Sequence, residues 1–125
     1  MPRQQRVLIV EDDADLRQLY CRTLAMAGYD VTEARGGFEA LRHLDSKLPD
    51  IVVLDLLLPG IDGRTVRDEL ASHALTRQIP IVVVTGLAEK LESLDVACIL
   101  RKPFSPDRLV EAVRTCLAAG SPRVS

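Results

Sequence analysis

Apolar and polar positions along the chain follow two periods, one typical of strands and the other typical of helices. Uninterrupted β-branched runs, such as the one that contains Val52 and Val53, indicate strands that are buried on both faces of a sheet. Strands of this kind occur mainly in parallel sheets, so the pattern predicts an α/β fold. Five strands are expected over residues 6–10, 30–34, 50–55, 79–84 and 96–100.

Segments with helical spacing fill the intervals between these strands and follow the last one. The spacing places Leu19 on the apolar face of the first helix and Phe38 on that of the second. Strands that alternate with helices predict right-handed βαβ units and a doubly wound parallel sheet with helices on both faces. The helices are expected over residues 13–27, 36–44, 64–72, 88–94 and 106–119.

The chain has 125 residues, which fits a single domain with a core over residues 6–119 and a tail or linker stub over 120–125. Apolar residues make up 47% of the chain, and the core must be aliphatic because aromatic residues make up only 3%. The net charge of −2 argues against direct contact with nucleic acid, which requires a basic surface. No apolar run approaches the roughly 18 residues of a membrane span, and the N-terminus carries no secretory signal, so we expect a cytoplasmic protein without membrane contact.

The cysteines and histidines do not form a metal or redox motif. Cys21, Cys98 and Cys116 are odd in number and widely separated, which is typical of reduced cysteines that serve as small apolar residues. His43 and His73 each lack a second ligand at metal-binding spacing, and both fall on expected helix surfaces. Candidate chemistry therefore has to come from other residues.

Polar residues stand where four of the expected strands end. Glu11 and Asp12 follow the first strand, Asp55 ends the third, Thr85 follows the fourth and Lys102 follows the fifth. The carboxyl ends of parallel strands share one edge of the sheet, where open α/β sheets bind their ligands. Carboxylates, a hydroxyl and an ammonium in one crevice suit Mg²⁺ and a phosphoryl group.

Each of these residues also has an ordinary structural interpretation. Acids before a helix are favoured by the helix dipole, so Glu11 and Asp12 could serve only to start the next helix. Asp55 could cap a loop, Thr85 could simply end a strand, and Lys102 could be a solvated surface charge. Their ordered combination favours the functional interpretation over these alternatives.

This combination, with Pro59 and Gly63 placed after Asp55, resembles the receiver domain of two-component response regulators. The resemblance covers residues 6–117. It implies a flavodoxin-like five-stranded sheet with strand order 2-1-3-4-5. It also implies that Mg²⁺, or Mn²⁺, supports transfer of a phosphoryl group to an aspartate from a sensor histidine kinase or a histidine phosphotransfer protein.

The resemblance assigns a metal site by position. It implies that Asp12 and Asp55 ligate the ion directly, that Glu11 acts mainly through water, and that the backbone carbonyl of Leu57 completes the protein ligands.

The resemblance also assigns the phosphoryl site and the function. Asp55 is then the phosphoacceptor, Thr85 and Lys102 contact the phosphoryl group, and the Lys102–Pro103 peptide bond is expected to be cis. We expect a switch that presents an altered surface to a downstream protein, and no enzymatic activity beyond its own phosphorylation and dephosphorylation. Such a domain works either alone or as part of a longer protein.

Three features depart from the family pattern. Only 17 positions separate Thr85 from Lys102, so the helix over residues 88–94 is expected to be shortened or irregular. Ile99 stands three residues before Lys102, where the family often has an aromatic residue that reorients during switching.

Leucines at positions 57 and 87 form the third departure. Leu57 and Leu87 stand two residues after Asp55 and Thr85, where polar groups often position a water molecule. We therefore expect slow hydrolysis of the acyl phosphate and a long-lived phosphorylated state.

Two other functions compete with the phospho-accepting switch as interpretations of this sequence. The shortened helix and Ile99 leave open a receiver-like interaction module with a degenerate switch. A Mg²⁺-dependent phosphatase with an aspartate nucleophile needs a second acid two residues after it, and Leu57 stands there. Nucleotide-binding folds are disfavoured because the GxGxxG and GxxxxGK[ST] motifs are absent.

Overall fold

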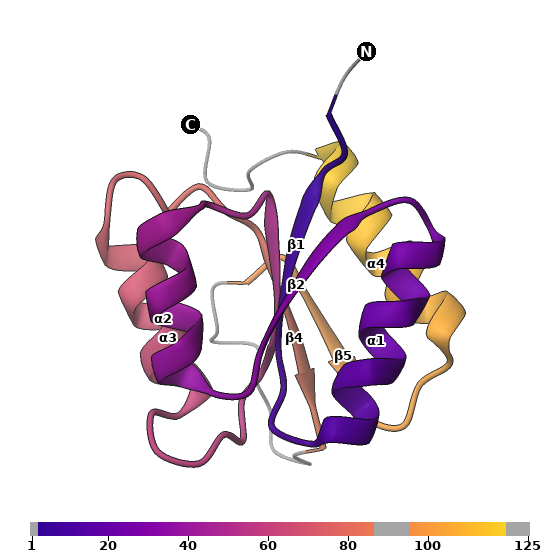
Figure 1. Cartoon of the computed structure of the whole chain (residues 1–125), viewed down its shortest axis with the longest axis horizontal. Helices are drawn as coiled ribbons and strands as arrows, with labels where there is room; N and C mark the ends of the chain where they lie inside the picture. Colours follow the sequence, from indigo (N-terminus) through magenta and orange to yellow (C-terminus); the bar gives the residue numbers. More distant parts are fainter. Residues whose placement is uncertain (1–2, 87–95, 120–125) are drawn as a thin grey trace.

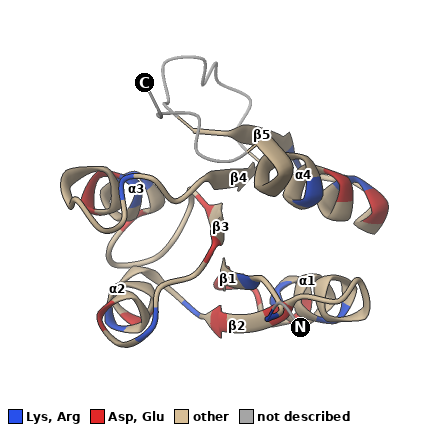
Figure 2. Ribbon diagram, turned by 90° about the horizontal axis from the view of Figure 1, so that it is seen from above, with Lys and Arg blue, Asp and Glu red and all other residues tan. Residues whose placement is uncertain are grey.

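Five parallel strands form one sheet at the centre of the molecule, in the order β2-β1-β3-β4-β5 (Figure 1, Figure 2). The structure is a computed structural model that describes residues 3–86 and 96–119. Its strand order confirms the flavodoxin-like sheet expected from the sequence. The strands are β1 (Arg6–Val10), β2 (Asp30–Ala34), β3 (Ile51–Asp55), β4 (Ile81–Thr85) and β5 (Cys98–Arg101).

The described helices cover both faces of this sheet and complete a three-layer sandwich (Figure 2). Helices α1 and α4 lie on one face, and α2 and α3 lie on the other. The helix expected over residues 88–94 lies outside the described residues, so α4 is the last of the expected helices. The helices are α1 (Ala14–Met26), α2 (Gly37–Ser46), α3 (Gly63–Ser72) and α4 (Pro106–Ala119).

The sheet sends alternate side chains into two separate apolar cores. In β1, Leu8 and Val10 pack on the side of α2 and α3, whereas Val7 and Ile9 pack on the side of α1 and α4. A slip of one residue would exchange the two faces of a strand, so this alternation fixes the register. In that register Val10 lies beside Leu54, and the carboxyl ends of β1 and β3 are level.

Aspartate side chains begin two of the helices that start at the carboxyl edge of the sheet. Asp13 caps α1 by accepting hydrogen bonds from the backbone N–H groups of Asp15 and Leu16. Asp62 caps α3 in the same way, with the backbone N–H of Arg64 as one donor. These two carboxylates are therefore engaged in holding helix ends.

The prediction that Leu19 faces the core is wrong. Leu19 is 45% exposed, and Arg17 is buried on the inner face of α1 together with Tyr20 and Leu24. Residues 17, 20 and 24 recur at helical intervals and share one face, whereas a residue two positions after Arg17 points to the opposite side. The inner face of α1 thus carries a charged residue, whereas hydrophobicity alone predicted a leucine on that face.

The prediction for Phe38 is also wrong, since this side chain is 69% exposed. Gly37 and Ala40 form the buried face of α2 instead. The helix approaches the loop after β3 so closely that a Cβ atom at Gly37 would lie 2.7 Å from the Cβ atom of Ile61. Only small residues fit at this contact, and the phenylalanine is turned outward.

The cysteines behave as small apolar residues, as expected. All three are free, and Cys116 is buried in the core between the sheet and α4. Burial raises the pKa of Cys21 to about 11, which keeps its thiol protonated and unreactive at neutral pH.

Gly63 generates a testable prediction about stability, because it begins α3 directly against the end of β3. Its N–H donates to the carbonyl of Leu56 at 3.0 Å, and an added Cβ atom would lie 2.6 Å from Cα of Leu56 and against the carbonyl of Asp55. We expect Gly63→Ala to lower the free energy of unfolding by about 1–3 kcal/mol, because the backbone must shift.

Gly36→Ala is the matched control for this prediction. Apart from its two chain neighbours, no described residue lies within 4 Å of a Cβ atom at Gly36, and the backbone there is extended, so the change should cost less than about 0.5 kcal/mol. Urea unfolding of both variants gives the comparison. Equal stabilities would show that the contact at Gly63 is relaxed in solution.

Candidate functional site

Three carboxylates gather where β1 and β3 end, as the sequence predicted. Glu11, Asp12 and Asp55 each place one carboxylate oxygen within 4.8 Å of the other two. Glu11 is 1% exposed and Asp55 4% exposed, whereas Asp12 faces the solvent. Two buried acids and one accessible acid thus form a cluster that is open on one side.

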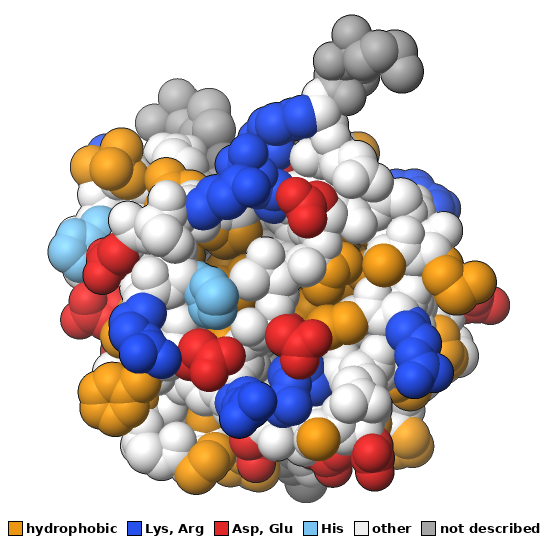
Figure 3. All heavy atoms as spheres, viewed as in Figure 1, with side chains coloured by type: hydrophobic (Ala, Val, Ile, Leu, Met, Phe, Trp, Pro, Cys, Tyr) orange, Lys and Arg blue, Asp and Glu red, His pale blue; other side chains and the backbone are white. Residues whose placement is uncertain are grey.

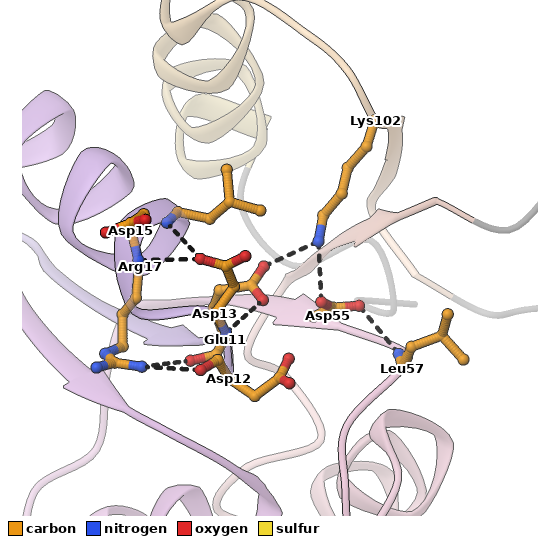
Figure 4. Close-up of polar contacts among 9 residues, drawn as sticks. Glu11, Asp12, Asp13, Asp15, Arg17, Asp55, Leu57 and Lys102 are labelled. Carbon is orange, nitrogen blue, oxygen red and sulfur yellow. Dashed lines mark hydrogen bonds and ion pairs between the residues drawn. The ribbon is translucent and has the colours of Figure 1, made fainter.

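Lys102 lies between the two buried acids (Figure 4). Its Nζ donates to Oε1 of Glu11 and to Oδ2 of Asp55, at 3.0 Å in each case. The Lys102–Pro103 peptide bond is cis, as expected, and the lysine follows directly after β5. One ammonium group from the edge of the sheet therefore neutralises carboxylates from two inner strands.

Backbone N–H groups hold the remaining oxygen of each buried acid. Oδ1 of Asp55 accepts from the N–H of Leu57 at 2.9 Å, and Oε2 of Glu11 accepts from the N–H of Asp13 at 3.2 Å. The side chain of Leu57 is itself 56% exposed beside Asp55. Both carboxylates are thereby fixed in orientation by the loops that follow their strands.

Thr85 is fully buried as the last residue of β4. It pairs with Arg101 in the ladder, and its carbonyl accepts a hydrogen bond from the N–H of Lys102 at 2.8 Å. The chain that carries the lysine is therefore joined directly to the strand that carries the threonine. All four strand ends named by the sequence meet at one edge of the sheet.

Burial is the largest single influence on the pKa values of Glu11 and Lys102 in the cluster. Burial raises the pKa of Glu11 to about 7, although hydrogen bonds from Lys102 and from the N–H of Asp13 oppose this rise, and Asp55 adds to it. Burial lowers the pKa of Lys102, but its hydrogen bonds to the two carboxylates outweigh burial and raise the pKa overall. Lys102 therefore stays positively charged beside the two buried acids.

The sequence analysis missed Arg17, which hydrogen-bonds to the backbone of two of the clustered acids. Its guanidinium donates to the backbone carbonyls of Glu11 at 3.0 Å and of Asp12 at 3.4 Å, and it pairs with Glu33 at 2.9 Å. One signal in the sequence was available, since Arg17 shares the helical phase of Tyr20 rather than that of an outward-facing residue.

Comparison with known proteins decides the family. The model of the family described as "Response regulator receiver domain" matches residues 7–114. This chain belongs to the response regulator receiver domain family. Receiver domains are modules of two-component signalling rather than conventional enzymes. The cluster of Glu11, Asp12 and Asp55 is the acidic pocket of this receiver domain.

Relatives and solved structures agree with this assignment. The chain is 33% identical over 123 residues to the phosphate regulon transcriptional regulatory protein PhoB of Klebsiella pneumoniae, covering 94% of this chain and 54% of that protein. It thus spans about half the length of the curated relatives that it matches.

Among solved structures, a CheY-like receiver domain protein of Methanospirillum hungatei is 27% identical, with a TM-score of 0.85, covering 94% of this chain and 96% of that one. The response regulator TrrA of Thermotoga maritima, solved in complex with Mg²⁺ and BeF, is 30% identical, with a TM-score of 0.81, covering 90% of this chain and 98% of that one. Both likenesses extend over nearly the whole receiver domain.

The donors in the acidic pocket suit a hard divalent cation. Mg²⁺ prefers oxygen ligands and usually binds one or two carboxylates together with water and phosphate oxygens. Glu11, Asp12 and Asp55 supply such oxygens, and Asp12 keeps the pocket accessible.

Among the described helices of this receiver domain, none combines the length and apolar character that a membrane span requires.

The raised pKa of Glu11 predicts how the stability of the metal-free protein depends on pH. A carboxyl whose pKa rises from 4.5 in the unfolded chain to about 7 in the folded one binds more protons when folded. The free energy of unfolding should therefore fall as the pH rises through this window. We expect Glu11→Gln, which cannot ionise, to flatten this part of the profile.

Urea unfolding in the presence of EDTA, repeated across the pH range, measures this effect. Glu111→Gln on the exposed face of α4 is the control, and its profile should run parallel to that of the wild type. A Glu11→Gln profile that also runs parallel to the wild type would refute the account of the buried charge.

Proposed function

We propose that this receiver domain is a phospho-accepting switch in which Asp55 takes a phosphoryl group from a sensor histidine kinase or a histidine phosphotransfer protein. The observation that carries the proposal is the position of Lys102, whose ammonium joins Asp55 to Glu11 beside the accessible Asp12. This arrangement supplies a nucleophile, acidic oxygens for a cation and a positive charge for a phosphoryl group within one pocket. The proposal takes residues 1–125 as a single receiver domain.

In the proposed reaction a carboxylate oxygen of Asp55 attacks the phosphorus atom of the donor. A new O–P bond forms while the bond between phosphorus and the donor's imidazole nitrogen breaks, and the bonding electron pair stays on that nitrogen. The N–H of Leu57 and the ammonium of Lys102 hold Asp55 in place for this attack. The energetic contribution of the protein is therefore mainly positioning and charge stabilisation.

Mg²⁺ or Mn²⁺ is the proposed cofactor. Asp12 and Asp55 would hold the ion directly, Glu11 would act mainly through water, and the backbone carbonyl of Leu57 would complete the protein ligands. When bound, the ion supplies positive charge that stabilises the transferring phosphoryl oxygens. The similar protein TrrA, solved with Mg²⁺ and BeF, supports this choice of ion.

Lys102 and Thr85 are proposed to contact the phosphoryl group once it is attached. Lys102 already touches Asp55 and would pair with a phosphoryl oxygen, which restores the balance of charge. Thr85 is buried at the adjacent strand end and would donate its hydroxyl to another oxygen. The Thr85 carbonyl accepts a hydrogen bond from the Lys102 N–H, so the two residues are held next to each other for this role.

The proposed output is an altered surface that a downstream protein recognises. Ile99 takes the place of the usual aromatic residue and packs against the core on the side of α2 and α3, so switching must work without an aromatic side chain there. On the face shown in Figure 3, acidic, basic and apolar side chains are intermixed. The net charge of −2 supports a protein partner rather than direct contact of this domain with nucleic acid.

Phosphorylation by a small-molecule donor tests the central residue. We expect the wild type to take up one phosphoryl group from acetyl phosphate in the presence of Mg²⁺, and Asp55→Asn to take up none, because an amide is not a nucleophile for this reaction. Intact-mass spectrometry measures the modification directly. Asp45→Asn, an exposed change on α2, is the control and should be modified like the wild type.

Two outcomes would contradict the proposal. Equal modification of the wild type and Asp55→Asn would place the phosphoryl group elsewhere. Continuous turnover of a phosphomonoester by the wild type would favour a phosphatase instead.

The exposed Leu57 side chain predicts the lifetime of the phosphorylated state. An apolar side chain beside Asp55 offers no hydrogen bond to orient an attacking water molecule. We expect Leu57→Asn to hydrolyse its acyl phosphate about tenfold faster, equivalent to about 1.4 kcal/mol of barrier. Decay of the phosphorylated form after removal of the donor measures the rate, and Leu57→Met, which stays apolar, should decay like the wild type. An unchanged rate in Leu57→Asn would refute this role.

A further inference from the structure

The loop between β1 and α1 carries two of the three clustered acids, and a buried arginine fixes its backbone. Arg17 is 7% exposed on the inner face of α1. Its Nη1 donates to the carbonyl of Glu11 at 3.0 Å, and the contact to the carbonyl of Asp12 is 3.4 Å (Figure 4). The two peptide groups held in this way belong to the residues whose carboxylates point into the acidic pocket.

A second residue fixes the arginine in turn. Nε of Arg17 pairs with Oε1 of Glu33 on β2 at 2.9 Å, and the N–H of Arg17 donates to the carbonyl of Asp13 at 2.9 Å. The guanidinium is planar and presents its donors in a fixed fork. Anchoring one edge of it on β2 therefore sets where the other edge places the carbonyl of Glu11.

Loss of the Arg17 donor would leave the carbonyl of Glu11 without this buried hydrogen bond. The hydrogen bond between Arg17 and Glu11 is buried, and a buried carbonyl that loses its partner costs free energy. Rotation of the Glu11 peptide would relieve that cost, but it would also move the carboxylates of Glu11 and Asp12. The hydrogen bonds that Arg17 donates to the backbone carbonyls therefore also hold the carboxylates of Glu11 and Asp12 in position.

We propose that Arg17, anchored by Glu33, is a positioning residue that sets the metal affinity of the acidic pocket by fixing the backbone of Glu11 and Asp12. The inference rests on the proposed function, because it assumes that these acids hold Mg²⁺. Arg17 itself touches neither the ion nor the phosphoryl group. Removing a residue that hydrogen-bonds to metal ligands, without touching the metal itself, typically weakens metal binding by about 10–100-fold.

The test is the dissociation constant for Mg²⁺, measured by calorimetry on the full chain, together with thermal unfolding. Arg17→Met should weaken Mg²⁺ binding by about tenfold or more, because both backbone contacts are lost. Arg17→Lys should lie between this variant and the wild type, since a single ammonium cannot serve the carbonyl and Glu33 together. Glu33→Gln, which retains an acceptor, should have a smaller effect than Arg17→Met.

Arg22→Met is the matched control, because Arg22 is exposed on the same helix and the change in net charge is identical. It should bind Mg²⁺ within about twofold of the wild type, as expected for a surface site away from the pocket. A second readout needs no metal. The amide resonance of Asp13, whose N–H contacts the Glu11 carboxylate, should shift in Arg17→Lys and Glu33→Gln in the presence of EDTA but not in Arg22→Met.

The outcomes separate this inference from the proposed function. If Arg17→Lys and Glu33→Gln unfold at lower temperature but keep wild-type affinity for Mg²⁺, the arginine is merely structural and the inference falls while the proposed function stands. If the wild type itself does not bind Mg²⁺, both fall. If Arg17→Met does not fold, Arg17→Lys and Glu33→Gln decide the question by the same two measurements.

Discussion

The hydrogen bonds from one lysine to two buried carboxylates are the constraint on which the rest of the site depends. Lys102 is separated from Glu11 by 91 residues and from Asp55 by 47, yet its Nζ lies 3.0 Å from an oxygen of each. Two buried acids without a cation would be strongly destabilising, so β5 and the chain after it have to deliver the ammonium to this point. The parallel sheet makes this possible, because it brings the carboxyl ends of all its strands to one edge.

Two cationic side chains, Lys102 and Arg17, hydrogen-bond to the acidic residues of the pocket, and they contact different groups. Lys102 neutralises one carboxylate oxygen of Glu11 and one of Asp55. Arg17 holds backbone carbonyls, so it orients the acids without competing for their oxygens. Burial is the main reason why the pKa of Glu11 is raised, and the hydrogen bond from Lys102 opposes this rise.

Much of this arrangement could be predicted from the sequence, because strand ends are easy to locate. The apolar runs before Asp12 and Asp55 are continuous, and a parallel sheet then fixes where their carboxylates meet. Arg17 escaped prediction because charged residues are rarely buried and its partners are backbone carbonyls and a residue on β2. The prediction for Phe38 failed because α2 packs so closely on the loop after β3 that only small residues fit between them. This close packing is a property of the tertiary structure and leaves no periodic signal in the sequence.

A crystal structure of the domain with Mg²⁺ and beryllofluoride would test the central claim most directly, because this ligand resembles an attached phosphoryl group. The account predicts beryllium bonded to a carboxylate oxygen of Asp55, Mg²⁺ bound by Asp12 and Asp55, and Lys102 paired with a fluoride. An ion held away from these carboxylates, or a Lys102 that still joins Glu11 to an unmodified Asp55 at saturating ligand, would contradict it.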